Sequence, residues 1–216
     1  IAIEARISNA YFAFRDAIGR RYDEGISCNS DEYTAVSFGG DYLNDRDMAN
    51  FSLHSVDQDA CKNQLNVYSE IQGGITKCNQ ILMDLGDENV SVSAPVRAAR
   101  AFYTFLLMDN WGDTPIIDYR LLGADGIVDR WIETELLEVR DDCPTEVSSE
   151  TYGTPTRWMV DALLAKLYIN WNVYTQDVTS ASWSSTATNE KLNDCVAACD
   201  DVIKSGLFDL SDDYNV

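Results

Sequence analysis

Residues 95–112, PVRAARAFYTFLLMDNWG, decide the fold class of this chain. Proline is favoured in the first turn of a helix, so the stretch predicts a helix from about Pro95 to Asn110. Its hydrophobic residues are not confined to one stripe; they are Val96, Ala99, Phe102, Tyr103, Phe105, Leu106, Leu107 and Met108. A helix that is hydrophobic on nearly all sides is buried on several sides. We therefore expect other elements to cover most of its surface.

The flanking sequence predicts further helices. Hydrophobic residues recur every three or four positions in the stretches 3–18, 57–85, 127–139, 155–174 and 192–203. We place the N-cap of the 155–174 helix at Thr154. The stretches 57–85 and 95–110 are joined by a short polar loop, which favours an antiparallel hairpin. The predicted fold class is mainly α, with paired antiparallel helices, long irregular loops and little sheet.

Length and composition fit one folded region. The chain has 216 residues, of which 45% are hydrophobic, enough to form a core. We expect residues 1–216 to form a single helical region. The last helix would present an uncovered hydrophobic face at the end of the assembly, so we also expect the chain to continue C-terminally. The longest hydrophobic run, near 98–108, is too short to span a membrane.

The charge of the chain restricts its ligands. Asp and Glu number 36 against 16 Lys and Arg, which gives a formal net charge of −20. Such a surface repels phosphate backbones and anionic lipid headgroups, so nucleic acids and electrostatic membrane binding are disfavoured. Neutral ligands, cations and basic partners remain open.

The sequence contains no recognisable catalytic or metal-binding pattern. We find no nucleophile with a base, no glycine-rich phosphate loop and one histidine, His54. Cys195 and Cys199 stand four residues apart on a helix, but two thiols leave a zinc ion incompletely coordinated. We expect no catalytic residue, no transition metal and no cofactor, although acidic loops leave calcium open. A carboxylate pair of the glycosidase type cannot be chosen among so many acidic residues.

One long irregular segment contains the residue types that bind polar, uncharged ligands. Residues 27–56 lack a sustained period and contain aromatic side chains among turn-forming residues. Aromatic faces and polar side chains together suit neutral polar ligands such as sugars. We predict a ligand site between Tyr33 and Phe51, formed by Asp41, Tyr42, Asn44, Asp45 and Arg46. The alternative is that this segment folds over the helices or faces a partner protein. A second aromatic with an exposed setting is Trp183, in the Ser/Thr-rich stretch 175–188.

Several motifs, in order along the chain, resemble those of the SusD/RagB family. They are SDE at 30–32, GGDY at 39–42, the helix from Tyr68 to Ile81, RAFYTFLL at 100–107 with NWGDTP at 110–115, PTRW at 155–158 with ALLAKLYIN at 162–170, and VIKSGLFDL at 202–210. The arginine, aromatic cluster and WGD stretch is the most specific of them. Tyr42 stands where the family usually has tryptophan.

The resemblance implies a fold, a function and a location. Family members have paired helices like tetratricopeptide units and are longer than this chain. They are lipoproteins anchored on the outer face of the outer membrane, where they pass ligand to a SusC-like TonB-dependent transporter. They bind oligosaccharides, or peptides in some branches, and are not enzymes. By resemblance this chain is a glycan-binding lipoprotein; the alternatives are a peptide-binding member or a glycan-cleaving enzyme.

Overall fold

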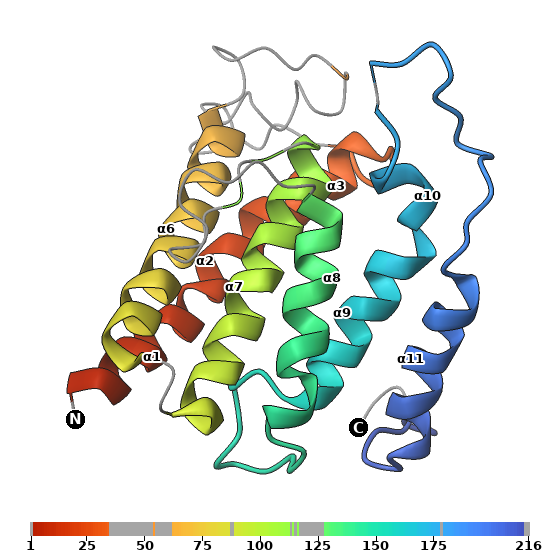
Figure 1. Cartoon of the computed structure of the whole chain (residues 1–216). Coiled ribbons are helices and arrows are strands. Elements are labelled where there is room, and N and C mark those ends of the chain that lie inside the picture. Colours follow the sequence, from red (N-terminus) through yellow and green to blue (C-terminus); the bar gives the residue numbers. More distant parts are fainter. Residues whose placement is uncertain are drawn as a thin grey trace. The chain divides into compact units, whose positions relative to one another are not determined.

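The computed structural model describes residues 2–34, 54, 62–86, 89–112, 114, 116, 128–177 and 179–213. The chain divides into two compact units, Ile1–Lys77 and Cys78–Val216. Figure 1 shows the elements in the colours of the sequence. We describe each unit by itself.

The first unit begins with three short helices, α1 (Ala2–Phe12), α2 (Phe14–Ile18) and α3 (Arg20–Asn29). The break before α3 requires a glycine, because a Cβ atom at Gly19 would lie 2.1 Å from the Arg15 carbonyl oxygen. Ala10 and Ala17 are fully buried. The unit ends within α6 (Lys62–Leu85), whose hydrophobic period buries Val67, Ile71 and Ile75.

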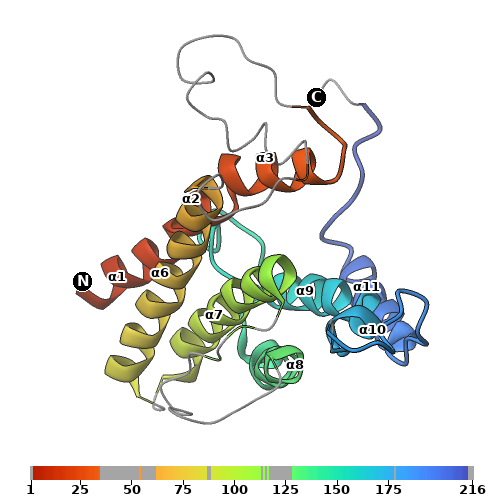
Figure 2. The same cartoon turned by 90° about the horizontal axis from the view of Figure 1, so that it is seen from above.

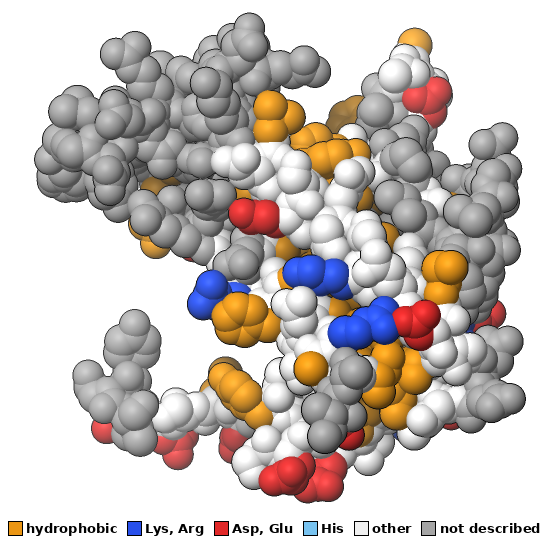
Figure 3. Space-filling view, turned by 90° about the vertical axis from the view of Figure 1, so that its left-hand side faces the viewer, with side chains coloured by type: hydrophobic (Ala, Val, Ile, Leu, Met, Phe, Trp, Pro, Cys, Tyr) orange, Lys and Arg blue, Asp and Glu red, His pale blue; other side chains and the backbone are white. Residues whose placement is uncertain are grey.

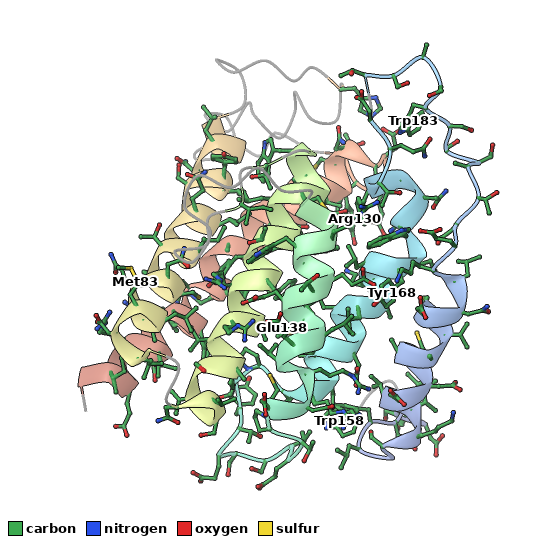
Figure 4. All side chains as sticks on the ribbon, viewed as in Figure 1. Met83, Arg130, Glu138, Trp158, Tyr168 and Trp183 are labelled. Atoms are coloured by element: carbon green, nitrogen blue, oxygen red, sulfur yellow. The ribbon has the colours of Figure 1, made fainter. Side chains whose placement is uncertain are left out.

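Helix α6 ends at Leu85, the predicted end of the 57–85 stretch, which lies in the second unit. Gly86 has a φ of 60°, and its N–H donates to the Leu82 carbonyl. This left-handed position favours glycine and closes the helix. Hydrophobic side chains of α6 also reach solvent, and one of them, Met83, is labelled in Figure 4.

On the face drawn in Figure 3, hydrophobic side chains emerge in separate small patches.

Helix α7 (Val90–Trp111) begins five residues before the predicted start at Pro95. The predicted start was wrong because the helix tolerates Pro95 in its interior. Pro95 cannot donate a hydrogen bond to the Ser91 carbonyl, and its ring crowds that carbonyl. Ser91 is exposed, so water can bind that carbonyl. Burial of Ala94, Val96 and the residues that follow offsets the cost. As predicted, α7 is buried on several sides.

The rest of the second unit continues the hairpin pattern. Helix α8 (Val128–Val139) is followed by the single 3₁₀ turn η2 (Arg140–Asp142), α9 (Arg157–Ile169), α10 (Trp171–Tyr174) and α11 (Leu192–Lys204). Helix α8 packs on α7 and α9, and α11 packs on α9. Figure 2 looks down on this arrangement and shows α8 nearly end-on.

The N-cap of α9 is Thr156 rather than the predicted Thr154. The Thr156 hydroxyl accepts a hydrogen bond from the Met159 N–H at 3.3 Å. Pro155 disfavours the helical conformation at Thr154, the residue before it, so Thr156, whose backbone is extended, caps the helix instead. The expected 155–174 helix is also interrupted, because Asn170 leaves the helical conformation between α9 and α10.

The described residues form helices and turns without a strand, which confirms the mainly α class. Within the same residues, no helix combines the length and hydrophobicity needed to cross a bilayer. The single region 1–216 and its C-terminal continuation stay predictions.

Candidate functional site

The five residues predicted to bind ligand, Asp41, Tyr42, Asn44, Asp45 and Arg46, lie outside the described residues. Described residues on either side of them do lie close together. The His54 Nε2 atom is 3.2 Å from an Asp31 carboxylate oxygen, and both side chains are exposed. Both residues have positive φ, 63° at Asp31 and 53° at His54. The two positions that bracket the predicted segment are therefore in contact.

A second candidate is the loop from Thr175 to Lys191, which joins α10 to α11 at one end of the second unit (Figure 1). The side chain of Gln176 holds the middle of this loop. Its Nε2 donates to the Ser184 carbonyl at 2.9 Å, and its Oε1 accepts from the Ser184 N–H at 2.9 Å. One amide side chain thus satisfies both backbone groups of the residue after Trp183.

Two asparagines fix the returning half of the loop. Asn172 Nδ2 donates to the Ala187 carbonyl at 2.8 Å. Asn189 Nδ2 donates to the carbonyl oxygens of Tyr168 at 2.9 Å and Ile169 at 3.0 Å, at the end of α9. Backbone polar groups of a surface loop otherwise bond to water, so these contacts give the loop a defined position.

A charged and aromatic cluster anchors the end of the loop. Lys191 Nζ lies 2.7 Å from Glu133 Oε1 on α8, and above the rings of Tyr168 at 5.2 Å and Trp171 at 5.3 Å. The Tyr168 hydroxyl donates to the same Glu133 oxygen at 2.9 Å. The hydrogen bond to Glu133 raises the pKa of Lys191 above its ordinary value. Burial, and then Glu133, raises the pKa of Tyr168. The cluster therefore keeps Lys191 charged and Tyr168 neutral.

Trp183 lies in the fixed loop with 40% of its surface exposed. Among the described residues, its indole N–H makes no hydrogen bond. The neighbouring side chains are hydroxyls, and two pairs bond to each other: Ser180 with Ser182 at 2.8 Å, and Ser184 with Thr186 at 3.0 Å. Figure 4 places Trp183 at one end of the unit and Trp158 at the other. The loop thus combines an aromatic face with hydroxyls.

In the interior of the second unit, a cluster of buried charged and polar side chains joins α6, α7 and α8. Arg100 is fully buried and donates to Glu135 Oε1 at 2.6 Å and to Asn79 Oδ1 at 2.7 Å. Arg97 donates to both oxygens of Glu135 at 2.7 and 2.8 Å. The Arg100 guanidinium also lies 5.4 Å from the Trp131 ring. With no exposed surface on Arg100, this cluster holds helices together and does not face a ligand.

A second cluster joins η2, α9 and α11. Arg140 donates to the buried carboxylate of Asp161 and to Asp201. Arg157, at the start of α9, lies 3.8 Å from the other Asp161 oxygen. Burial raises the pKa of Asp161, while its bond to Arg140 opposes that rise. These contacts position α11 and therefore the far end of the loop that precedes it.

Two of the described cysteines, Cys143 and Cys195, have environments that disfavour the reactive thiolate form. Burial raises the pKa of Cys143 to about 12 and also raises the pKa of Cys195, and the thiol is the unreactive form. The Cys195 thiol donates to the Ala165 carbonyl at 3.4 Å, while Cys199 is exposed. In the described part of the chain, no three His, Cys, Asp or Glu side chains are grouped as a metal site would need.

Sequence reasoning did not find the residues that fix the loop. It singled out Trp183, but not Gln176, Asn172 or the Lys191–Glu133 pair. The only local signal was the frequency of amide side chains at the two ends of the Ser/Thr-rich stretch. Glu133 and Lys191 are 58 residues apart, so no spacing rule links them.

Comparison with solved structures places this arrangement among known folds. A laminarin-binding SusD-like protein matches 80% of this chain and 40% of its own chain, with a TM-score of 0.65 and 23% identity. A SusD-like protein from Bacteroides fragilis matches 97% of this chain and 39% of its own, with a TM-score of 0.68 and 17% identity. The chain thus spans about two fifths of the length of either protein. No protein-family model and no curated protein matches the sequence. The helical hairpins described above have the SusD-like fold.

Proposed function

We propose that this chain is part of a SusD-type surface protein that captures a neutral oligosaccharide and delivers it to a TonB-dependent transporter of the outer membrane. The observation that carries the proposal is the fold shared with a laminarin-binding SusD-like protein over 80% of the chain. A lipid anchor on the outer face of the membrane belongs to the same proposal, by resemblance to the family.

The charge of the chain supports a neutral ligand. A formal net charge of −20 disfavours sulfated, phosphorylated or strongly acidic polymers. Neutral sugars present C–H faces to aromatic rings and hydroxyls to polar side chains, so their recognition needs no net positive surface. A binding role also fits the raised pKa of the buried thiols Cys143 and Cys195, which disfavours the thiolate needed for nucleophilic chemistry.

We propose the segment from Tyr33 to Phe51 as the main ligand site. In this proposal, Tyr42 offers a flat aromatic face and Arg46 a planar set of N–H donors. Asp41, Asn44 and Asp45 accept hydrogen bonds from sugar hydroxyls. Contact between Asp31 and His54 supports the proposal, because it brings the two sides of the segment together on the surface.

Affinity electrophoresis and calorimetry of the full-length protein against a panel of neutral polysaccharides, with laminarin included, test the proposal. We expect binding to at least one of them, and Tyr42→Ala and Arg46→Ala each to raise Kd by about fivefold or more. Repeating the titration in EDTA tests the calcium that the acidic loops leave open: a loss of affinity would assign calcium a role, and an unchanged affinity would agree with binding without a cofactor. Binding to peptides alone would assign the protein to the peptide-binding alternative, and new reducing ends would make it a glycan-cleaving enzyme.

Delivery to a transporter requires a separate measurement. We expect the full-length protein, purified from its own outer membrane in mild detergent, to co-purify with a TonB-dependent transporter. If the protein binds sugar but is recovered without a transporter, the result supports oligosaccharide capture and contradicts delivery to a transporter.

A further inference from the structure

The loop from Thr179 to Thr188, with Trp183 near its middle, has the properties of a binding surface that the proposed site does not use. We propose that this loop is a second carbohydrate contact, in which Trp183 stacks on a sugar ring and the surrounding Ser and Thr side chains bond its hydroxyls. The inference rests on the proposed function for the class of ligand, and it adds a contact on a different unit of the chain.

The first argument is that the indole of Trp183 is not needed to hold the loop. Gln176 bonds both backbone groups of Ser184, and Asn172 and Asn189 fix the returning half. A tryptophan that served only to pin a loop would be buried by the elements it contacts. Here 40% of the residue stays exposed, although burial of a large aromatic side chain is strongly favourable.

The second argument is that side-chain hydrogen bonds within the chain hold the backbone of the loop without a ligand. Ordering a mobile loop on binding costs free energy for each immobilised side chain. Here the hydrogen bonds from Asn172 on α10 and from Asn189 near the end of the loop form during folding, so the cost does not fall on binding. Lys191, held by Glu133 at 2.7 Å, fixes the point where the loop enters α11. The backbone that carries Trp183 is therefore held in place on its C-terminal side by Gln176, which reduces the ordering cost of a stacking contact.

The third argument concerns the class of ligand. Residues 178–188 contain no Asp, Glu, Lys, Arg or His, in a chain of formal net charge −20. The absence of positive charge disfavours phosphate-bearing ligands. Exposed Ser182 directly precedes Trp183, and exposed Ser185 and Thr186 follow it after Ser184. Hydroxyls both donate and accept, which matches the hydroxyls of a neutral sugar better than the mainly hydrophobic side chains of a docking peptide.

The test compares Trp183→Ala and Trp183→Phe with Tyr152→Ala in the full-length protein. Tyr152 is the matched control, because it is 92% exposed and lies in the loop between η2 and α9, at the opposite end of the unit (Figure 1). The probe is the neutral polysaccharide from the panel that the wild-type protein binds most tightly. We expect Trp183→Ala to raise Kd by about threefold to tenfold, Trp183→Phe to raise it less, and Tyr152→Ala to leave it unchanged.

The outcomes separate this inference from the proposed function. Unchanged sugar affinity in Trp183→Ala, with the melting temperature preserved, would overturn the second contact alone. Weaker co-purification with the transporter in that variant, at unchanged sugar affinity, would overturn it too and identify a protein interface. Equal losses in Trp183→Ala and Tyr152→Ala would also contradict it. If the wild-type protein binds no neutral polysaccharide, the proposed function and this inference both fall.

Discussion

Replacement of Glu135 by leucine should cost the second unit much of its stability. Glu135 is the shared partner of Arg97 and of the fully buried Arg100, with N–O distances of 2.6 to 2.8 Å. Leucine keeps most of the volume and removes every acceptor. The fold must then bury the Arg100 guanidinium without the Glu135 carboxylate.

The magnitude follows from the geometry. At an effective dielectric constant of about 20, opposite charges 2.6 Å apart attract each other by about 6 kcal/mol. Lost hydration of the two groups offsets much of that attraction in the folded state. When one partner is removed, the hydration loss of the other remains, so we expect Glu135→Leu to lower the free energy of unfolding by about 3–5 kcal/mol.

The matched control is the same substitution at Glu138. Glu138 also bonds Arg97, but its side chain is 53% exposed, so its loss should cost less than about 1 kcal/mol. A double variant, Arg100→Met with Glu135→Leu, should recover most of the stability, because the two buried charges of the pair are then removed together.

Urea unfolding, followed by circular dichroism and extrapolated to water, measures these differences. The reasoning fails if Glu135→Leu costs no more than Glu138→Leu. It also fails if the double variant is as unstable as the single one, since the loss would then come from packing rather than from an uncompensated charge.

Three further predictions concern the loop anchor, a helix cap and the thiols. Lys191→Gln should lower the free energy of unfolding at pH 7. Because Glu133 raises the pKa of Lys191 above 10.5, the stability difference between the wild-type protein and this variant should be full below that pH and disappear as pH rises through the raised pKa. Urea unfolding from pH 7 to 12 measures this difference. Thr156→Ala should lower the free energy of unfolding, measured with urea, by about 1 kcal/mol through loss of the α9 N-cap. A loss smaller than about 0.3 kcal/mol would show that the Thr156 side chain does not stabilise the helix. Cys195 and Cys199 should retain no stoichiometric zinc after dialysis against a chelator, measured by elemental analysis; zinc that persists and is lost in Cys195→Ser would disprove this.

Much of the helical architecture could be predicted because helical periodicity is local. The recurrence of hydrophobic residues every three or four positions along α6, α8 and α11 follows from the geometry of the helix itself. The stop at Gly86 was equally local, since a left-handed residue closes the helix. The starts of α7 and α9 were predicted less well. In α7, burial offset the cost of Pro95 and let the helix begin five residues earlier. In α9, Thr154 and Thr156 offered the same capping side chain, and the conformation around Pro155 selected the second.

The sequence by itself determined the mainly helical class, the acidic surface and the presence of an aromatic, hydroxyl-rich stretch around Trp183. Only the tertiary structure decided which carboxylate meets Arg100, since 36 acidic residues offered candidates and Glu135 is 35 positions away. It likewise decided that Gln176 and Asn172 would hold the loop and leave Trp183 exposed. The physical reason is that periodicity and charge depend on neighbours along the chain. The pairing of a buried charge, and the exposure of one ring, depend on which distant surfaces packing brings together.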